Sequence, residues 1–128
     1  MSSTSFDGLA GEVVEILAAK DATRAKALLK RIHDEKAFVL ADYYIGGDVL
    51  DEAARLHALH IALVSMFVKG SAGGVTGIDL LLAKAFSEAL AGCRDVEPPR
   101  ELQGELAEFY STTVEALNGL LRRLCSKS

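Results

Sequence analysis

The stretch from Asp48 to Lys69, DVLDEAARLHALHIALVSMFVK, constrains the fold more than any other part of the chain. Wound as a helix at about 100° per residue, it carries apolar side chains over most of its circumference. The polar strip that remains is narrow and consists of Asp51, Arg55, Ser65 and Lys69. A helix of this kind must be covered by other helices, so we expect it at the centre of the fold.

The composition favours an all-α protein. Half of the 128 residues are hydrophobic, only two are proline, and none is tryptophan. Alanine and leucine dominate the apolar set, and both are good helix formers. A chain of this length is typical of one domain. We therefore expect a single domain over residues 1–128, with residues 1–5 frayed, built as a compact bundle of four to six antiparallel helices of the helical-hairpin type around a central buried helix at about 48–69.

The first part of the chain predicts helices on either side of Asp21. Apolar residues recur at helical spacing over residues 6–20, and Asp21 can cap the helix that follows. The apolar stripe of that helix changes phase at Lys36, which stands where an apolar residue is expected. Residues 21–45 therefore form either one long kinked helix or two helices. The glycine pair at 46–47 ends the segment, because glycine readily adopts the left-handed conformation of a helix C-terminus.

Two further helices are predicted after the central one. Thr76 and Asp79 can form a capping box at the start of a helix that ends at Gly92. Pro99 suits the first turn of a long last helix. Between the central helix and Thr76, a glycine-rich segment reads as a loop.

Charge and hydropathy indicate a cytoplasmic protein without a membrane segment. The formal net charge is -4, which argues against a surface built as a whole for phosphate backbones. The N-terminal residues lack the basic and continuous apolar regions of a signal peptide. The longest apolar run, at 58–68, is well short of the roughly 20 residues that a membrane-spanning helix needs.

The cysteines and histidines do not form a recognisable metal-binding pattern. Cys93 and Cys125 are far apart and belong to no CxxC motif, so we expect two free thiols. His57 and His60 share an apolar sector, but no Glu-x-x-His motif accompanies them, and His33 has less context still. We therefore expect histidines that are hydrogen-bonded in the core or at an interface, with no metal and no cofactor.

The segment LADYYIGGDVLDEAARLH has a large-small pair and an aromatic residue before its glycine turn, and a large residue and an alanine after it. The residues concerned are Leu40, Ala41, Tyr44, Leu50, Ala53 and His57. This pattern resembles one tetratricopeptide-type helical hairpin, over roughly residues 34–63. The resemblance implies two antiparallel helices in close contact. No second copy follows at the repeat period, so an ordinary αα-hairpin is the alternative.

Arg55-Leu-His-Ala-Leu-His60 resembles the Arg-then-His motif of ribonucleases in the HEPN superfamily, which are small all-α domains and often dimers. The resemblance implies that Arg55 holds the scissile phosphate and His60 moves protons. Leu56 replaces the polar residue that the family carries beside its arginine. Arg55 lies on the polar strip next to Asp51, with which it can pair at i,i+4, whereas His60 lies well over 100° away around the helix.

These features favour a non-catalytic helical protein-interaction module that associates with itself or with a protein partner. Tyr43 and His57 are the candidate binding residues, because aromatic side chains carry much of the energy of interfaces. The alternative is a HEPN-like ribonuclease or toxin-antitoxin component that uses Arg55 and His60. A nucleic-acid partner is expected only under that alternative.

Overall fold

The structure, a computed structural model, describes residues 5–46, 49–68, 77–100 and 102–126, apart from the side chains of residues 5, 43 and 44. Within these residues the chain is all-α and contains no strand. Its helices are α1 (Ser5–Ala19), α2 (Ala22–Tyr44), α3 (Leu50–Val64), α4 (Ile78–Gly92) and α5 (Gly104–Ser126), with a short 3-10 turn at Ser65–Phe67. The predicted fold class is confirmed.

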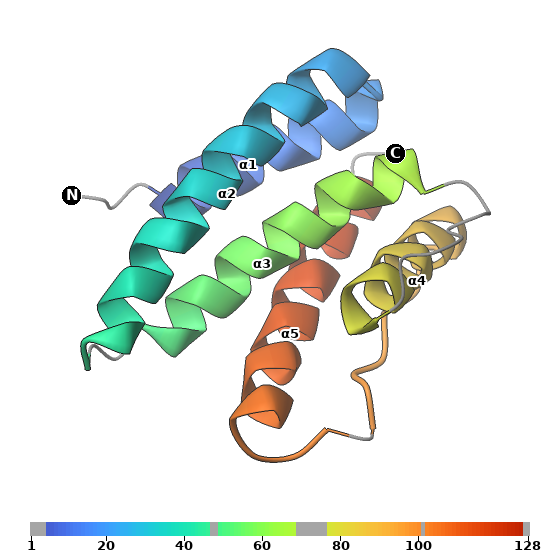
Figure 1. The fold of residues 1–128 in the computed structure, drawn as a ribbon. Helices are drawn as coiled ribbons and strands as arrows, with labels where there is room; N and C mark the ends of the chain where they lie inside the picture. The colour runs from blue at the N-terminus through green and yellow to red at the C-terminus, as the bar shows by residue number, and fades with distance from the viewer. Residues whose placement is uncertain (1–4, 47–48, 69–76, 101, 127–128) are drawn as a thin grey trace.

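Helix α3 occupies the centre, as its sequence predicts, and contacts each of the other α-helices. Figure 1 shows α1 and α2 on one side of α3, α4 on the other side, and α5 crossing behind it. Small residues allow this close packing, since Ala54 and Ala58 are fully buried. Thr113 of α5, also fully buried, donates a hydrogen bond to the Ala54 carbonyl at 3.1 Å. Its hydroxyl is therefore satisfied inside the core.

One apolar core joins the helices around α3. Its largest fully buried side chains come from every helix, and each such side chain contributes about 1.5–3 kcal/mol relative to an exposed one. They are Ile16, Ile32, Leu56, Leu59, Ile61, Leu63, Phe86 and Leu117. Helix α3 supplies four of these eight, which agrees with its predicted position.

The central helix is shorter than the stretch that predicts it. It begins at Leu50, with Val49 as its N-cap residue, and gives way to a 3-10 turn after Val64. The buried Ser65 hydroxyl donates to the Ala62 carbonyl at the point of change. Asp48 and Lys69 lie outside the described residues.

Residues 22–44 form one helix rather than two, and the apparent change of phase has a specific cause. Lys36 does point inward, where its ammonium meets His57 of α3. A polar residue therefore occupies an inward position of a continuous helix. Asp21 caps the helix as predicted, because its carboxylate accepts a hydrogen bond from the Arg24 backbone N–H at 3.1 Å. Gly46, with φ of 102°, follows the helix in the left-handed region.

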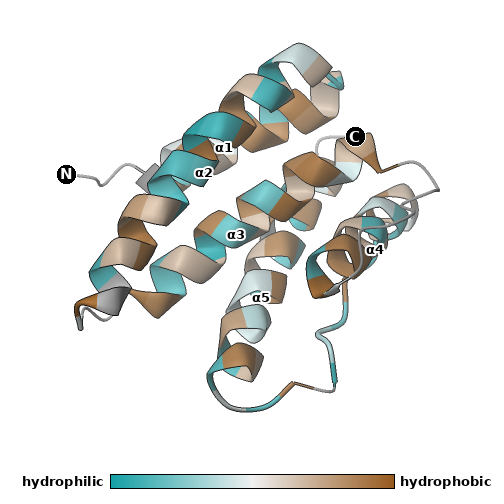
Figure 2. Ribbon diagram, in the orientation of Figure 1, coloured by the Kyte–Doolittle hydropathy of each residue, from teal (hydrophilic) through white to brown (hydrophobic). Residues whose placement is uncertain are grey.

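Helix α1 covers only the first part of α2. It has 15 residues whereas α2 has 23, and its N-terminal end lies beside the middle of α2 (Figure 1). Among the described side chains of α2, the buried hydrophobic ones all belong to its first half, namely Ala25, Leu28 and Ile32. Beyond Ile32 the helix still carries hydrophobic residues, as Figure 2 shows. This half of α2 packs on α3 and leaves its outer side exposed.

The last helix does not begin at Pro99, contrary to the sequence prediction. It begins at Gly104, whose φ of 67° lies in the left-handed region that glycine adopts without steric cost. Val96, in the irregular segment that follows α4, is held by the Asn118 side chain. The Val96 N–H donates to Asn118 Oδ1 at 2.7 Å, and Asn118 Nδ2 donates to the Val96 carbonyl at 3.1 Å. Val96 is buried, so its backbone groups obtain hydrogen-bond partners within the protein.

Cys93 and Cys125 form a disulfide, so the prediction of free thiols is wrong. Their Cα atoms are 5.9 Å apart, because the C-terminal ends of α4 and α5 lie together. Cys93 itself adopts a left-handed conformation with φ of 51°, and the next residue, Arg94, donates its N–H to the Ala89 carbonyl at 3.0 Å. The cysteine therefore occupies the helix-ending position that is usually taken by glycine.

No helix among the described residues is both long enough and apolar enough to cross a bilayer.

Candidate functional site

The one buried histidine of the described chain, His57, lies between a cation and an anion. Its Nδ1 is 2.9 Å from Lys36 Nζ, and its Nε2 is 2.8 Å from Asp79 Oδ1. The three residues come from α3, α2 and α4. Tyr110 of α5 adds a hydrogen bond, because its hydroxyl donates to Asp79 Oδ1 at 2.8 Å. We call Lys36, His57, Asp79 and Tyr110 the His57 network.

The chemistry of the neighbours assigns the proton positions of His57. An ammonium group can only donate, so Lys36 requires an acceptor at Nδ1. The remaining imidazole proton is then on Nε2, where it is donated to the Asp79 carboxylate. His57 is thus a neutral link between a positive and a negative charge. This arrangement satisfies both ring nitrogens of a buried histidine.

Charge and burial shift the pKa values of the network. The hydrogen bond from His57 lowers the pKa of Asp79 from 3.8 to about 2, although its partial burial acts in the opposite direction. Burial raises the pKa of the Tyr110 hydroxyl, and its bond to the Asp79 carboxylate raises it further. Burial lowers the pKa of Lys36, opposed by the attraction of Asp79. These shifts keep Asp79 charged and Tyr110 neutral at pH 7.

The sequence predicts that Thr76 and Asp79 form a capping box at the start of α4. Gly77 is the N-cap residue of this helix, and no side-chain hydrogen bond caps it among the described residues. Thr76 lies outside the described residues. Asp79 instead receives the two hydrogen bonds from His57 and Tyr110. Its position in the first turn of α4 still favours a negative charge.

His60 lies beside the network without joining it. Its ring stacks on that of His57, with centroids 5.9 Å apart. Its Nδ1 is buried and finds no hydrogen-bond partner among the described residues. Burial, with the positive charge of Lys36 next in importance, lowers the pKa of His60 from 6.5 to about 4. His60 is therefore neutral at pH 7, with one buried nitrogen unsatisfied.

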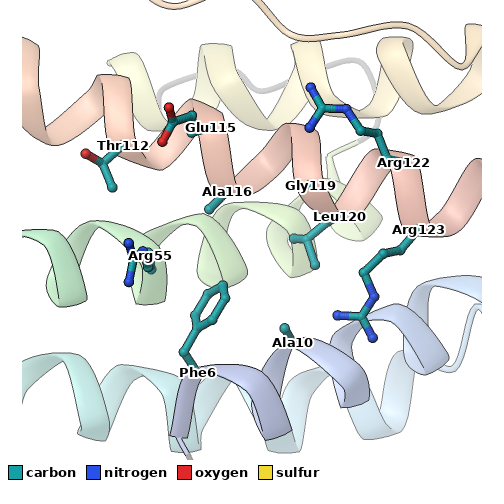
Figure 3. A pocket seen from close by; sticks show the side chains of 10 residues that line it. All are labelled: Phe6, Ala10, Arg55, Thr112, Glu115, Ala116, Gly119, Leu120, Arg122 and Arg123. Atoms are coloured by element: carbon teal, nitrogen blue, oxygen red, sulfur yellow. The ribbon is translucent and has the colours of Figure 1, made fainter.

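Arg55 lies elsewhere, on the rim of a pocket of about 520 Å³ between α1, α3 and α5. We call it the arginine pocket. Arg122 and Arg123 of α5 also line it, together with Glu115 (Figure 3). Its floor is apolar and comprises Phe6, Ala10, Ala116 and Leu120. The predicted Asp51–Arg55 ion pair is not among those of the described residues, so Arg55 is free to face this pocket.

The structure separates the residues that the sequence analysis grouped together. Arg55 lines the arginine pocket, whereas His60 stacks on His57 and does not line that pocket. His57 is the member of the predicted binding pair that can be located. The side chain of Tyr43 lies outside the described part of the structure. Within the described part, no three His, Cys, Asp or Glu side chains gather as metal ligands.

Sequence reasoning found His57 but missed the other three residues of the His57 network. One signal was present, since Lys36 interrupts an apolar stripe. A polar residue at an inward helix position usually has a buried partner. Asp79 and Tyr110 gave no such signal, because each has an ordinary explanation in its own helix. Comparisons with protein-family models, curated proteins and solved structures find no match for this chain.

Proposed function

We propose that the protein is a non-catalytic helical interaction module that pairs with a second copy of itself through α2. The contact surface consists of Phe38 and Ala41, on the outer side of the second half of this helix, and of Ile45, which directly follows it. We call it the α2 face.

The exposure of two large apolar side chains carries the proposal. Phe38 is 78% exposed and Ile45 is 82% exposed, more than the other large hydrophobic residues of the described chain. Burying each would contribute about 1.5–3 kcal/mol. They lie beyond the part of α2 that α1 covers, so no helix of the described chain shields them.

The spacing of the three residues suits helix pairing. Ala41 follows Phe38 by three positions, and Ile45 follows Ala41 by four, which is the spacing of the apolar seam in coiled coils. The Ile45 N–H bonds to the Asp42 carbonyl at 3.2 Å, so the helical turn carries Ile45 onto the same side. The small side chain of Ala41 allows a second helix to approach closely.

A twofold axis fits this order of side chains. If two copies of α2 pair antiparallel, Phe38 of one copy lies near Ile45 of the other, and Ala41 lies close to the axis. A twofold interface uses the same patch on both subunits and must therefore be self-complementary. The large-small-large order of the α2 face meets that condition.

Light scattering coupled to gel filtration tests the proposal across the micromolar range. We expect the original protein to be a dimer and the double variant Phe38→Ser/Ile45→Ser to be a monomer. The matched control is Leu81→Ser, because Leu81 is also 67% exposed but lies on α4. A monomeric original protein, or a double variant that still dimerises, would overturn the proposal. Circular dichroism verifies that each variant remains helical.

The ribonuclease alternative rests on a different observation: Arg55 is exposed, faces a pocket and makes no ion pair within the described residues. Because His60 of the same chain does not line that pocket, the reaction would need His60 from a second copy. RNA cleavage that is abolished by both Arg55→Gln and His60→Gln, in proteins that still dimerise, would support this alternative. Absence of cleavage by the original protein excludes it for the RNA tested.

A further inference from the structure

The arginine pocket has the dimensions and lining of a small-molecule site. Its volume of about 520 Å³ lies within the range of about 300–1,000 Å³ that is typical of ligand pockets. It lies between three helices of the bundle, a common position for such sites. It is separate from the α2 face, none of whose residues line it.

Two of its guanidinium groups are available to a ligand. Arg55 and Arg123 make no ion pair within the described chain, whereas Arg122 pairs with Asp95 across 3.7 Å. In Figure 3 Arg55 and Arg123 lie at opposite ends of the pocket, and Arg123 reaches toward α1. Planar guanidinium groups bind carboxylate, sulfonate and phosphate oxygens well, and often with two parallel hydrogen bonds.

One carboxylate, that of Glu115, opposes them on the rim. The Arg122–Asp95 pair is neutral as a unit, so two cations remain against one anion. The balance favours a ligand with a single negative group rather than a cation or a highly charged anion.

The floor between the two arginines favours an apolar ligand body. Phe6 and Leu120 provide its large side chains. Gly119 leaves open space beside them, because a Cβ atom at this position would meet no atom within 4 Å. A flat hydrocarbon body can therefore lie on this floor while its charged group reaches a guanidinium.

We propose that the arginine pocket binds a small organic anion, with its apolar body on Phe6 and Leu120 and its negative group paired with Arg55 or Arg123. The class is that of aryl or alkyl carboxylates, sulfonates and phosphates. The proposal is independent of self-association through the α2 face.

Two fluorescent probes with nearly the same body test it. Anilinonaphthalene sulfonate carries the negative group, and phenylnaphthylamine lacks it. We expect one sulfonate probe to bind per chain, about 10-fold to 100-fold more tightly than the neutral probe, as one charge-assisted hydrogen bond would produce. Equal affinity for both probes would overturn the proposal, as would no binding of the sulfonate.

Variants locate the binding. Arg55→Gln and Arg123→Gln remove a pocket cation, and we expect at least one to lower the affinity for the sulfonate about 10-fold without affecting the neutral probe. Arg94→Gln is the matched control, since it removes the same charge from an exposed residue outside the pocket. Sulfonate binding that is unchanged in both pocket variants, or equally reduced in the control, would contradict the assignment.

A third variant tests the floor. Gly119→Phe fills the open space while keeping every charge, so we expect it to abolish binding of both probes. Thermal unfolding shows whether this variant is folded, and if it is not, Gly119→Leu replaces it. Full affinity for the sulfonate in a folded variant of this kind would place the probe outside the pocket and overturn the proposal.

Discussion

Lys36 Nζ lies 2.9 Å from His57 Nδ1, although 21 residues separate them in the chain. The contact explains why a lysine interrupts the apolar stripe of α2. His57 in turn hydrogen-bonds to Asp79 of α4, which also accepts a hydrogen bond from Tyr110 of α5. One chain of hydrogen bonds thereby connects four of the helices.

Removing Asp79 should destabilise the protein. Asp79→Ala leaves the His57 N–H and the Tyr110 hydroxyl without their acceptor, which we expect to lower the free energy of unfolding by about 1–3 kcal/mol in urea titrations. Asp51→Ala is the matched control, because Asp51 is also the exposed second residue of a helix but forms no ion pair among the described residues. Both variants lose the favourable interaction with the helix dipole. Equal effects of the two substitutions would show that the network contributes nothing further.

The contribution of Asp79 should disappear in strong acid. Its folded-state pKa of about 2 lies below the ordinary value of 3.8, so its charge stabilises the fold at pH values above 3.8. The contribution is lost as the pH falls from 3.8 toward 2. The difference in unfolding free energy between the original protein and Asp79→Asn should therefore shrink over this interval. Because the side chain is 55% exposed, solvent screening limits its size. A constant difference would contradict the prediction.

His60 should make the protein sensitive to milder acid. Its folded-state pKa of about 4 is below the ordinary 6.5, so between these values the unfolded chain binds a proton that the folded chain does not. Stability should decrease as the pH falls from 6.5 to 4. His60→Phe removes this group together with its unsatisfied nitrogen, and urea titrations at several pH values should show a smaller decrease. An identical pH dependence would exclude His60 as the cause.

Reduction of the disulfide should lower stability strongly. The bond closes a loop of 32 residues, and the loss of chain entropy in the unfolded state predicts about 3–4 kcal/mol. Unfolding with and without reductant measures the effect, and the Cys93→Ser/Cys125→Ser variant should match the reduced protein. Maleimide that labels both cysteines in the unfolded, unreduced protein would contradict the bond.

The same bond bears on the predicted cytoplasmic location. Disulfides persist mainly in oxidising compartments, whereas the sequence features favoured the cytoplasm. Trapping the thiols with maleimide at the moment of cell lysis distinguishes the two environments. If the protein is cytoplasmic, we expect both cysteines to be labelled in the cell extract and the bond to form only after exposure to oxidant.

Asn118 should be needed to hold the chain at Val96, in the irregular segment that follows α4. Asn118→Ala removes both partners of the Val96 backbone, which is partly buried, and should cost about 1–3 kcal/mol. Ser111→Ala, an exposed substitution in the same helix, should change stability by less than about 0.5 kcal/mol. Hydrogen exchange at the Val96 amide provides a local measurement, and unchanged protection in Asn118→Ala would contradict the proposed anchor.

Periodicity was sufficient to predict the class of fold and the central position of α3, because both depend on where apolar residues recur along one helix. The start of α5 could not be predicted in this way. Pro99 fits a helix N-terminus locally, but the pairing of Val96 with Asn118 depends on contact between residues 22 positions apart. The disulfide could not be predicted from the sequence for the same reason, since only the packed ends of α4 and α5 bring the two cysteines together.

The candidate sites likewise contain some residues that the sequence identifies and others that only the packed helices reveal. His57 was identifiable from its place in an apolar sector, and Lys36 left a trace as an interruption of a stripe. Asp79 and Tyr110 each fit their own helix without any partner, so only the assembled bundle reveals their role. Arg55 and His60 are close in sequence, yet the geometry of one helix turns them toward different surroundings.

The position of the disulfide also affects how easily the last turn of α5 unwinds. A terminal helix usually frays from its free end, because its last turn has the fewest contacts. Here Cys125 is in the last turn of α5 and is bound to the end of α4. A force or a protease acting on the C-terminus would therefore have to displace two helices together. After reduction, the last turn of α5 would be able to unwind without displacing α4.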